Sequence, residues 1–378
     1  DLTGQAASLL VPLDVPGLAT NASGVSRRFT AGDRGEPIEY LVDADFLPAG
    51  VTQAQALTAV SNAFQAWATV TSLRFKFLGV TSFGVAAANV STNDARIRIQ
   101  LHDNYGSISG SSTLGVGGNA FTISLGMGGN VAGNEFFPVL KGNVVMKHTQ
   151  TSLQNLKTLE EVICHEIGHV LSMEHSSESS FETDGTPRKE AIMYFQAHAD
   201  GRGATLGTYD PPVVQQAYPT NNTPPYGYNR MLHIVTASPT PNITGINEVE
   251  IRGYDQQTNS LTLSVTSSTS ANGSFSLNGS TLRYTPNAFF SDSSRIDPAT
   301  TSAFDRAFLR LSDGTNGSPN IEVRVLSFSA DTVSDGLPDN WMTLFFGNAN
   351  PGAGALRGPN DDNDGDGVSN LNESRLGT

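Results

Sequence analysis

The sequence lacks the features that would cross-link the chain or insert it into a membrane. It has a single cysteine among 378 residues, so an intrachain disulfide is excluded. No hydrophobic stretch reaches the length that a membrane-spanning helix needs. Charged residues make up only 15% of the chain, and the formal net charge is −14. An acidic chain of this kind argues against nucleic-acid binding.

Turn-forming residues, by contrast, are abundant. The 38 glycines and 19 prolines indicate many turns, and the length suits two or three domains. Little lysine and much Ser, Thr, Asn and Gly favour a secreted, extracellular protein. The chain opens with Asp1 rather than Met, as expected of a processed mature chain.

The most informative segment runs from His165 to His175 and begins with the pattern H-E-x-x-H. On a helix, His165 and His169 share one face and can hold one metal ion. Glu166 beside them is a candidate general base. His175 completes a set of three nitrogens with one open position. A catalytic zinc needs that open position, whereas a structural zinc is closed by a fourth protein ligand.

The segment around these histidines predicts a helix over residues 158–171. Thr158 and Glu161 form a capping-box pattern, and apolar residues recur at helical spacing behind it. The chain must then turn sharply to return His175 to the metal. In the longer motif H-E-x-x-H-x-x-G-x-x-H a glycine makes this turn. Ser172 stands there instead, and serine tolerates a left-handed backbone less well, so the turn geometry stays open.

These motifs resemble the metzincin zinc endopeptidases. Ser176 after the third histidine and Ala-Ile-Met-Tyr at 191–194 are similar to the matrixin branch. The resemblance makes Met193 the methionine of the Met-turn, a hydrophobic floor beneath the zinc. The longer spacing from His175 to Met193 predicts an inserted loop, residues 177–190, near the cleft.

The resemblance extends over about residues 28–219. It implies an α+β (α/β-sandwich) domain with a mixed sheet and an active-site helix. It also implies a substrate extended along a sheet edge and a pocket walled by residues 195–203. The supporting segments are strands at 38–42, 96–100 and 142–146, a helix at 54–70, and a closing helix at 206–218 with Asp210 as N-cap and Pro211 at its first position.

Other residues near the motif have plainer readings. Tyr194 either shapes the cleft or only packs. Cys164 is expected to be a buried small hydrophobe rather than a nucleophile. Since it is the sole cysteine, the latency device that the resemblance implies, a pro-segment cysteine on the zinc, is not expected; either the pro-segment is absent from this chain or latency works differently. The remaining histidines are expected to be surface or loop residues: His102, His148, His198 and His233.

Outside this region the sequence pattern changes from helical spacing to short alternating strands separated by turns. Residues 1–27 are an N-terminal arm or the remnant of a pro-segment, and residues 220–230 form a linker. Short alternating strands at 231–330 predict an all-β, antiparallel sandwich of Greek-key type, similar to cadherin-like or Ig-like modules. Such a module acts as a spacer, or it makes cell-surface or glycan contacts.

The C-terminal segment, residues 331–378, predicts a small calcium-binding domain. Residues 362–373 fit the twelve-position calcium loop. The ligand positions are Asp362, Asp364, Asp366, the carbonyl of Val368, Asn370 and Glu373. A weaker second site has Asp331, Asp335 and Asp339, and the pair resembles thrombospondin type 3-like repeats. With little apolar area to bury, the domain is expected to unfold when calcium is removed.

The resulting hypothesis is a secreted zinc-dependent endopeptidase that acts on protein or peptide substrates. Two alternatives stay open. One is a cell-surface adhesion or carbohydrate-binding protein with a vestigial protease domain, although the intact Glu166 speaks against it. The other is a processing protease that acts on one partner recognised by the appended modules.

Overall fold

A computed structural model describes residues 17–198, 200–237, 242–243, 247–270, 273–286, 305–328, 337, 342, 346–347, 358–363 and 369–370. The chain divides into two compact units. The first comprises residues 1–225 with 255–259 and 315–319. The second comprises residues 226–254, 260–314 and 320–378.

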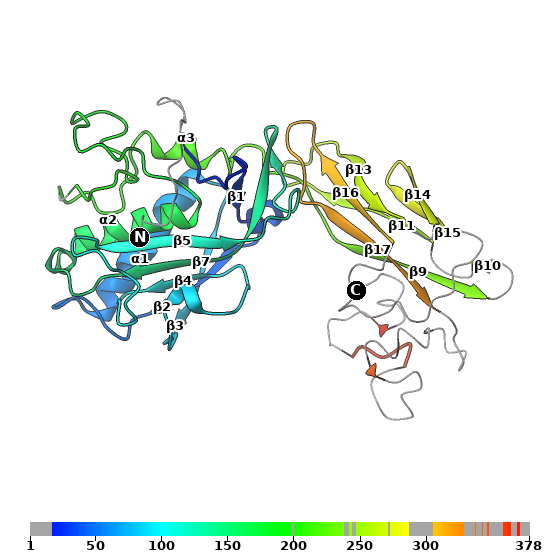
Figure 1. Cartoon of the computed structure of the whole chain (residues 1–378), viewed down its shortest axis with the longest axis horizontal. Helices are drawn as coiled ribbons and strands as arrows, with labels where there is room; N and C mark the ends of the chain where they lie inside the picture. Colours follow the sequence, from blue (N-terminus) through cyan, green and yellow to red (C-terminus); the bar gives the residue numbers. More distant parts are fainter. Residues whose placement is uncertain are drawn as a thin grey trace. The chain divides into compact units, whose positions relative to one another are not determined.

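The first unit is built on a mixed sheet (Figure 1). Five strands are parallel, in the order β1 (Ser26–Arg28), β7 (Asn134–Met146), β4 (Ile97–Gln100), β2 (Ile38–Asp43) and β3 (Phe75–Val80). Two more pair antiparallel with β7, namely β5 (Gly115–Phe121) and β6 (Asn130–Val131). Every residue of β4 is buried, as expected for an inner parallel strand. The predicted mixed sheet is confirmed.

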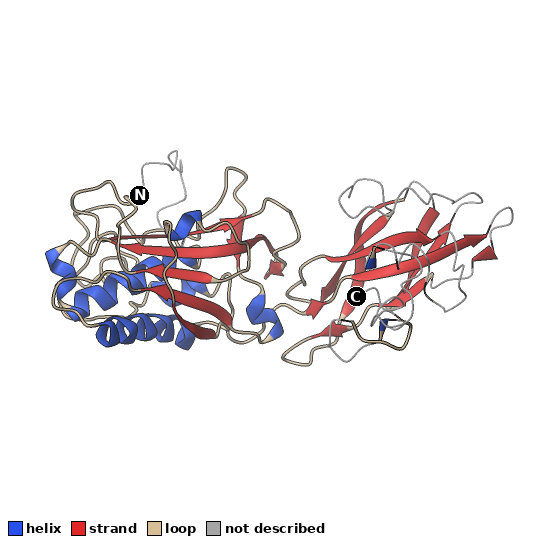
Figure 2. Cartoon of the chain, turned by 90° about the horizontal axis from the view of Figure 1, so that it is seen from below, coloured by secondary structure: helices blue, strands red, loops and turns tan. Residues whose placement is uncertain are grey.

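Two long helices, α1 (Gln53–Val70) and α2 (Leu156–Val170), lie side by side against this sheet (Figures 1 and 2). Between the helices, the fully buried Trp67 donates its Nε1–H to the carbonyl of Cys164 at 2.9 Å. Cys164 is itself fully buried, and burial raises the pKa of its thiol well above the usual value. The reading of Cys164 as a buried hydrophobe is confirmed.

Shorter helices complete this unit: η2 (Ala31–Arg34), η3 (Ala87–Asn89), η4 (Thr151–Gln154) and α3 (Asp210–Val214). The predicted start of α2 was wrong. The turn η4 leaves Asn155 extended just before the helix, and its side chain accepts from the N–H groups of Lys157 and Thr158. Asn155 is therefore the N-cap, and Glu161 is free for another partner.

The closing helix also differs from its prediction. It spans only Asp210–Val214, and its N-cap is Tyr209. Asp210 lies inside the first turn, so its carboxylate does not cap the helix. It accepts instead from the N–H groups of Ile192, Met193 and Gly207, which draws α3 towards the chain after the third histidine.

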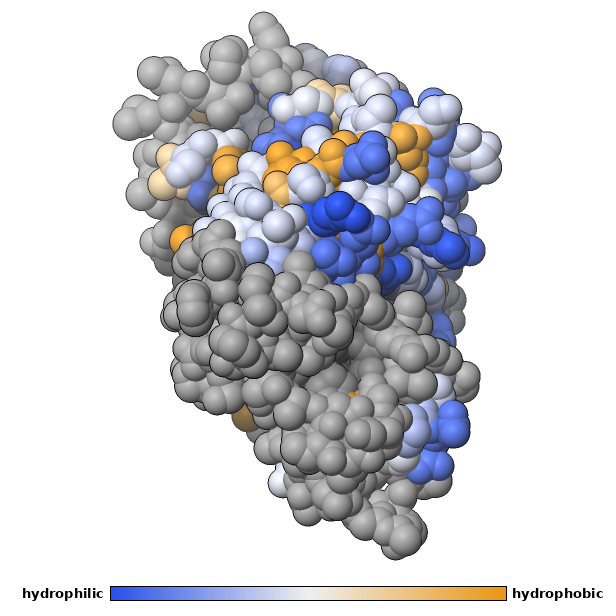
Figure 3. Space-filling view, turned by 90° about the vertical axis from the view of Figure 1, so that its right-hand side faces the viewer, coloured by the Kyte–Doolittle hydropathy of each residue, from blue (hydrophilic) through white to orange (hydrophobic). Residues whose placement is uncertain are grey.

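The second unit contains two larger sheets that share one apolar core. One sheet has the order β10-β9-β17-β16-β13, and the other β11-β15-β14, with a two-stranded ribbon β12-β8 beside them. On the face shown in Figure 3, the described residues are a mixture of hydrophobic and hydrophilic ones. The strands are β8 (Tyr226–Gly227), β9 (Arg230–Ala237), β10 (Asn242–Ile243), β11 (Glu248–Glu250), β12 (Gly253–Tyr254), β13 (Thr262–Thr269), β14 (Gly273–Asn278), β15 (Thr281–Pro286), β16 (Arg306–Ser312) and β17 (Ile321–Phe328).

The prediction of a purely antiparallel sandwich was wrong in one respect, because β17 and β9 pair in parallel. These two strands are close to the two ends of the predicted module. Alternation along each strand identified its faces, but it carries no information on the direction of a partner.

Part of the predicted calcium loop is described. The Asn370 side chain is buried, accepts from the N–H of Asn363 at 3.3 Å and donates to the carbonyl of Gly358 at 2.8 Å. Asp362 is described as well. The other predicted calcium ligands lie outside the described residues: Asp331, Asp335, Asp339, Asp364, Asp366, Val368 and Glu373. Among the described parts of the chain, no helix is long and apolar enough to cross a membrane.

Candidate metal centre

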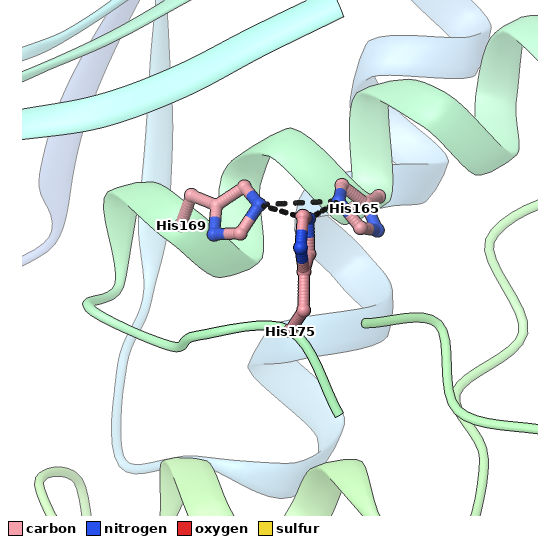
Figure 4. A group of neighbouring side chains, drawn as sticks. All are labelled: His165, His169 and His175. Carbon is pink, nitrogen blue, oxygen red and sulfur yellow. Dashed lines mark hydrogen bonds between the residues drawn. The ribbon is translucent and has the colours of Figure 1, made fainter. Parts of the chain in front are cut away.

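Helix α2 and the loop after it bring three histidines together (Figure 4). His165 and His169 project from successive turns of the helix, and His175 faces them from the loop. The Nε2 atom of His169 lies 3.1 Å from that of His165 and 3.2 Å from that of His175. The third pair, His165 and His175, is also 3.2 Å apart.

The far side of each ring fixes its tautomer. The Nδ1 atoms lie 2.7 Å from the carbonyl oxygen of Ile192, 2.8 Å from that of Met173, and 2.5 Å from a carboxylate oxygen of Glu178. These partners are acceptors only, so each Nδ1 carries the proton. Each Nε2 therefore directs a lone pair at the other two. In neutral imidazoles of this tautomer no proton lies between the Nε2 atoms, and a cation is what such a cluster accommodates.

The spacing suits zinc in particular. Tetrahedral bonds of about 2.0–2.1 Å place ligand nitrogens about 3.3 Å apart. Metal ligation also requires neutral imidazole. Burial, with the neighbouring His175, lowers the pKa of His165 to about 3, and burial lowers that of His169 well below its usual value. The residues present therefore fit a zinc ion.

Glu166 follows His165 on the helix and is 6% exposed. Burial raises the pKa of its carboxyl to about 8, although the N–H of Gly117 in β5 donates to it and opposes the rise. β5 lies very close to the helix at Gly117, since a Cβ there would lie 2.2 Å from the carbonyl oxygen of Glu166. A glycine at this point lets the edge strand rest directly on the active-site helix.

A family model described as Matrixin matches residues 35–218. This part of the chain is a matrixin-like metzincin domain. No curated protein matches the chain. The match includes the central strands, both long helices and all three histidines. It supports a zinc metallopeptidase with an α+β fold, and it confirms the resemblance for this domain. The resemblances of the later segments stay predictions.

In the matrixin-like domain the turn after α2 is made by a strained serine. Ser172 is fully buried with φ of 74°, in the left-handed region that costs a non-glycine residue about 1–2 kcal/mol. Asn119 in β5 donates its Nδ2–H groups to the Ser172 hydroxyl and to the Val170 carbonyl, both at 2.9 Å. The N–H of Ala19 donates to the Ser172 carbonyl at 2.7 Å. These bonds hold the turn that a glycine would make unaided.

Met193 forms the floor beneath α2. A Cβ on Gly168 would lie 2.2 Å from its sulfur, so the glycine between the histidines admits the methionine. The adjacent backbone is held by Asp210, which accepts from Ile192 at 2.8 Å and Met193 at 3.3 Å. Burial raises the pKa of Asp210 to about 6, against these hydrogen bonds. Because Ile192 also accepts from His165, Asp210 supports a candidate ligand indirectly.

The loop at 195–203 is tied to α2 and to the inserted loop. His198 lies between a carboxylate oxygen of Glu161 and the carbonyl of Lys189, 2.7 Å from each. Arg202 donates to the carbonyl and the carboxylate of Glu190. Tyr194 is buried, and its hydroxyl donates to the carbonyl of Ser179 at 2.8 Å. Tyr194 thus links the Met-turn to the insertion, which favours a packing role.

A second group of potential ligands consists of Asp43, Asp45 and His102. His102 lies in the loop after β4, which fits the expectation of a surface or loop residue, but its side chain is buried, at 1% exposed. Its Nε2–H donates to Asp43 at 3.1 Å, and its Nδ1 accepts from the N–H of Asn104. Asp43 also accepts from the N–H groups of Asp45 and Phe83. Both side chains have partners, so the group is read as structural.

The two other histidines of that prediction lie in different settings. His148 is partly buried in the turn after β7 and accepts from the N–H of Asp103 at 3.4 Å. His233 is in β9, and its side chain is outside the described residues. Sequence reasoning also missed Asn119 and Glu178 as supports of the centre, and Glu161 as the partner of His198. Only Glu178 carried a signal, its position three residues after His175.

Proposed function

We propose that the protein is a secreted zinc-dependent endopeptidase in which His165, His169 and His175 hold the zinc and Glu166 is the general base. The observation that carries the proposal is the convergence of three Nε2 atoms within 3.2 Å of one another, each on a ring whose Nδ1 faces an oxygen acceptor. Secretion is supported by the composition, with its low charge and abundant Ser, Thr, Asn and Gly.

The surroundings of the site suit an extended peptide. Among the residues that the structure describes, β5 pairs with β7 along one edge only. Its other edge offers backbone N–H and carbonyl groups to which a peptide can add as a further strand. Since β5 also contacts Glu166 through Gly117, a peptide bound there lies beside the proposed base.

The chemistry then follows from the residues in place. Zinc held by the three nitrogens would supply Lewis acidity, lowering the pKa of water from ~15.7 towards ~7 and polarising the scissile carbonyl. Glu166 accepts a proton from the attacking water as its oxygen bonds to the carbonyl carbon. It then delivers this proton to the amine nitrogen as the C–N bond breaks. The three histidines, as the proposed zinc ligands, take no part in proton transfer.

The test is zinc content and peptide cleavage of the whole chain and of its Glu166→Ala variant. The wild type should hold one catalytic zinc, and the variant should keep it while cleavage falls by about 10²–10⁴-fold. The matched control is Asp184→Asn, an exposed acidic residue of the inserted loop. A folded wild type without zinc would refute the metal site, and a fully active Glu166→Ala variant would refute the mechanism.

The breadth of the substrate is tested by digesting a peptide library. Cleavage at many sequences is the expected result for a general endopeptidase. Cleavage at one narrow sequence would instead indicate a processing enzyme. No cleavage by the zinc-loaded chain would leave only the reading of a vestigial protease domain.

A further inference from the structure

The three histidines differ in what holds the far side of each ring. His165 and His169 donate their Nδ1–H to backbone carbonyls, of Ile192 and Met173. His175 donates to the carboxylate of Glu178 at 2.5 Å. A hydrogen bond to an ionised carboxylate is shorter and about twice as strong as one to a neutral carbonyl. His175 is thus the one member of the cluster with a charged partner.

Glu178 belongs to the inserted loop, and its side chain is 66% exposed. Its position is nevertheless fixed by its neighbours in the chain. The N–H of Ser176 donates to the carbonyl of Met193 at 2.8 Å, and the Tyr194 hydroxyl donates to the carbonyl of Ser179 at 2.8 Å. A β-bridge joins Ser177 to Tyr194. The backbone on both sides of Glu178 is therefore anchored to the Met-turn.

We propose that Glu178 is a positioning residue for the metal centre, an inference that rests on the proposed function. By accepting from Nδ1, it orients the His175 ring, selects the tautomer with a free Nε2 and strengthens that nitrogen as a donor to the metal. This gives the inserted loop a role. It supplies a carboxylate to the single histidine that comes from a loop and not from α2.

This role can be isolated by mutation, because the other two acceptors are backbone carbonyls. Glu178→Ala removes the oxygen and its charge, while Glu178→Gln keeps an acceptor oxygen and removes the charge only. Glu182→Gln is the matched control. Glu182 lies in the same loop and accepts from the Ser177 hydroxyl at 2.7 Å, but it does not contact a histidine in the described structure.

The experiment measures the zinc dissociation constant of the full chain at one fixed pH by competition with a coloured chelator. The visible spectrum of the Co²⁺-loaded protein reports on the ligand field. We expect Glu178→Ala to weaken zinc binding by about 10–100-fold and to shift the Co²⁺ bands, with a smaller effect for Glu178→Gln. Glu182→Gln should match the wild type, and the metal-free variants should unfold at the same denaturant concentration.

The possible failures are distinguishable. A wild type that binds no zinc overturns the proposed function itself. A wild type that binds zinc, with Glu178→Ala binding it within about twofold as tightly, overturns the role of Glu178 alone. Equal losses in Glu178→Ala and Glu182→Gln also overturn it, because they would trace the effect to packing of the loop and not to the carboxylate.

Discussion

Ser172 shows how a single residue can depart from a motif while the motif keeps its geometry. A left-handed backbone is costly for serine, yet the turn before His175 requires it. Asn119 compensates from β5, which is distant in the sequence, by bonding to the hydroxyl and to the end of the helix. The two residues should therefore depend on each other energetically.

Asn119→Ala should lower the free energy of unfolding by about 1–3 kcal/mol, since two hydrogen bonds are lost in a buried turn. The same change should cost less in a Ser172→Gly background, where the backbone needs no support and the hydroxyl is gone. Urea unfolding of the four proteins of this double-mutant cycle measures the coupling. Strictly additive effects would show that Asn119 does not stabilise Ser172.

At the scale of elements, the contact between β5 and α2 depends on one glycine. Gly117→Ala would place a methyl group 2.2 Å from the Glu166 carbonyl, so the strand or the helix must move. We expect a loss of about 1–3 kcal/mol in stability and a fall in peptide cleavage. The control is Gly118→Ala, where a Cβ meets no atom within 4 Å. If Gly117→Ala and Gly118→Ala both have the unfolding free energy of the wild type, β5 and α2 are not in tight contact at Gly117.

The stability contributed by the hydrogen bond between Glu161 of α2 and His198 of the loop at 195–203 should depend on pH. Burial lowers the pKa of His198, but its hydrogen bonds to Glu161 and the Lys189 carbonyl outweigh burial and raise it above the usual value. A raised pKa in the folded state means that the pair contributes its full stability below about pH 6.5 and loses it as pH rises through the folded pKa.

Glu161→Gln should therefore destabilise the protein more at about pH 5.5 than at about pH 8.5 in urea unfolding. Glu190→Gln is the control, because Glu190 pairs with Arg202, which stays charged at both values. The effect of Glu190→Gln should change less with pH than that of Glu161→Gln, because Glu190 is not a hydrogen-bond partner of His198. An equal effect of Glu161→Gln at both values would mean that His198 does not titrate against Glu161 in this range.

At the scale of the whole molecule, the two kinds of metal site should act on different parts of the chain. Removing calcium while zinc is kept in excess should expose residues 331–378 to added protease and leave the matrixin-like domain intact. Asp364→Asn should reproduce this sensitivity with calcium present, whereas Asp184→Asn should not. Mass spectrometry of the fragments locates the cuts. An unchanged fragment pattern after calcium removal would argue against the calcium-binding domain.

The sequence by itself determined the features that depend on local spacing. We could predict the three histidines of the candidate metal centre, the amphipathic helix and the alternating strands from the sequence. Helices and strands repeat their side-chain directions every few residues, so short sequence patterns reveal them. Capping of α2 was misread because both Thr158 and Asn155 are good cap residues, and the preceding turn η4 decided between them.

Only the tertiary structure decided what supports the centre. Asn119 and Asp210 reach it from β5 and α3. Away from the centre, packing also buries the loop residue His102 against Asp43 of β2. The parallel pairing of β9 with β17 was also decided only by the tertiary structure. Such contacts join residues far apart in the chain, and a hydrogen bond between them exists only once packing has brought donor and acceptor within about 3 Å. Local spacing in the sequence identifies the residues proposed to carry out the chemistry. Tertiary packing determines which other residues position them.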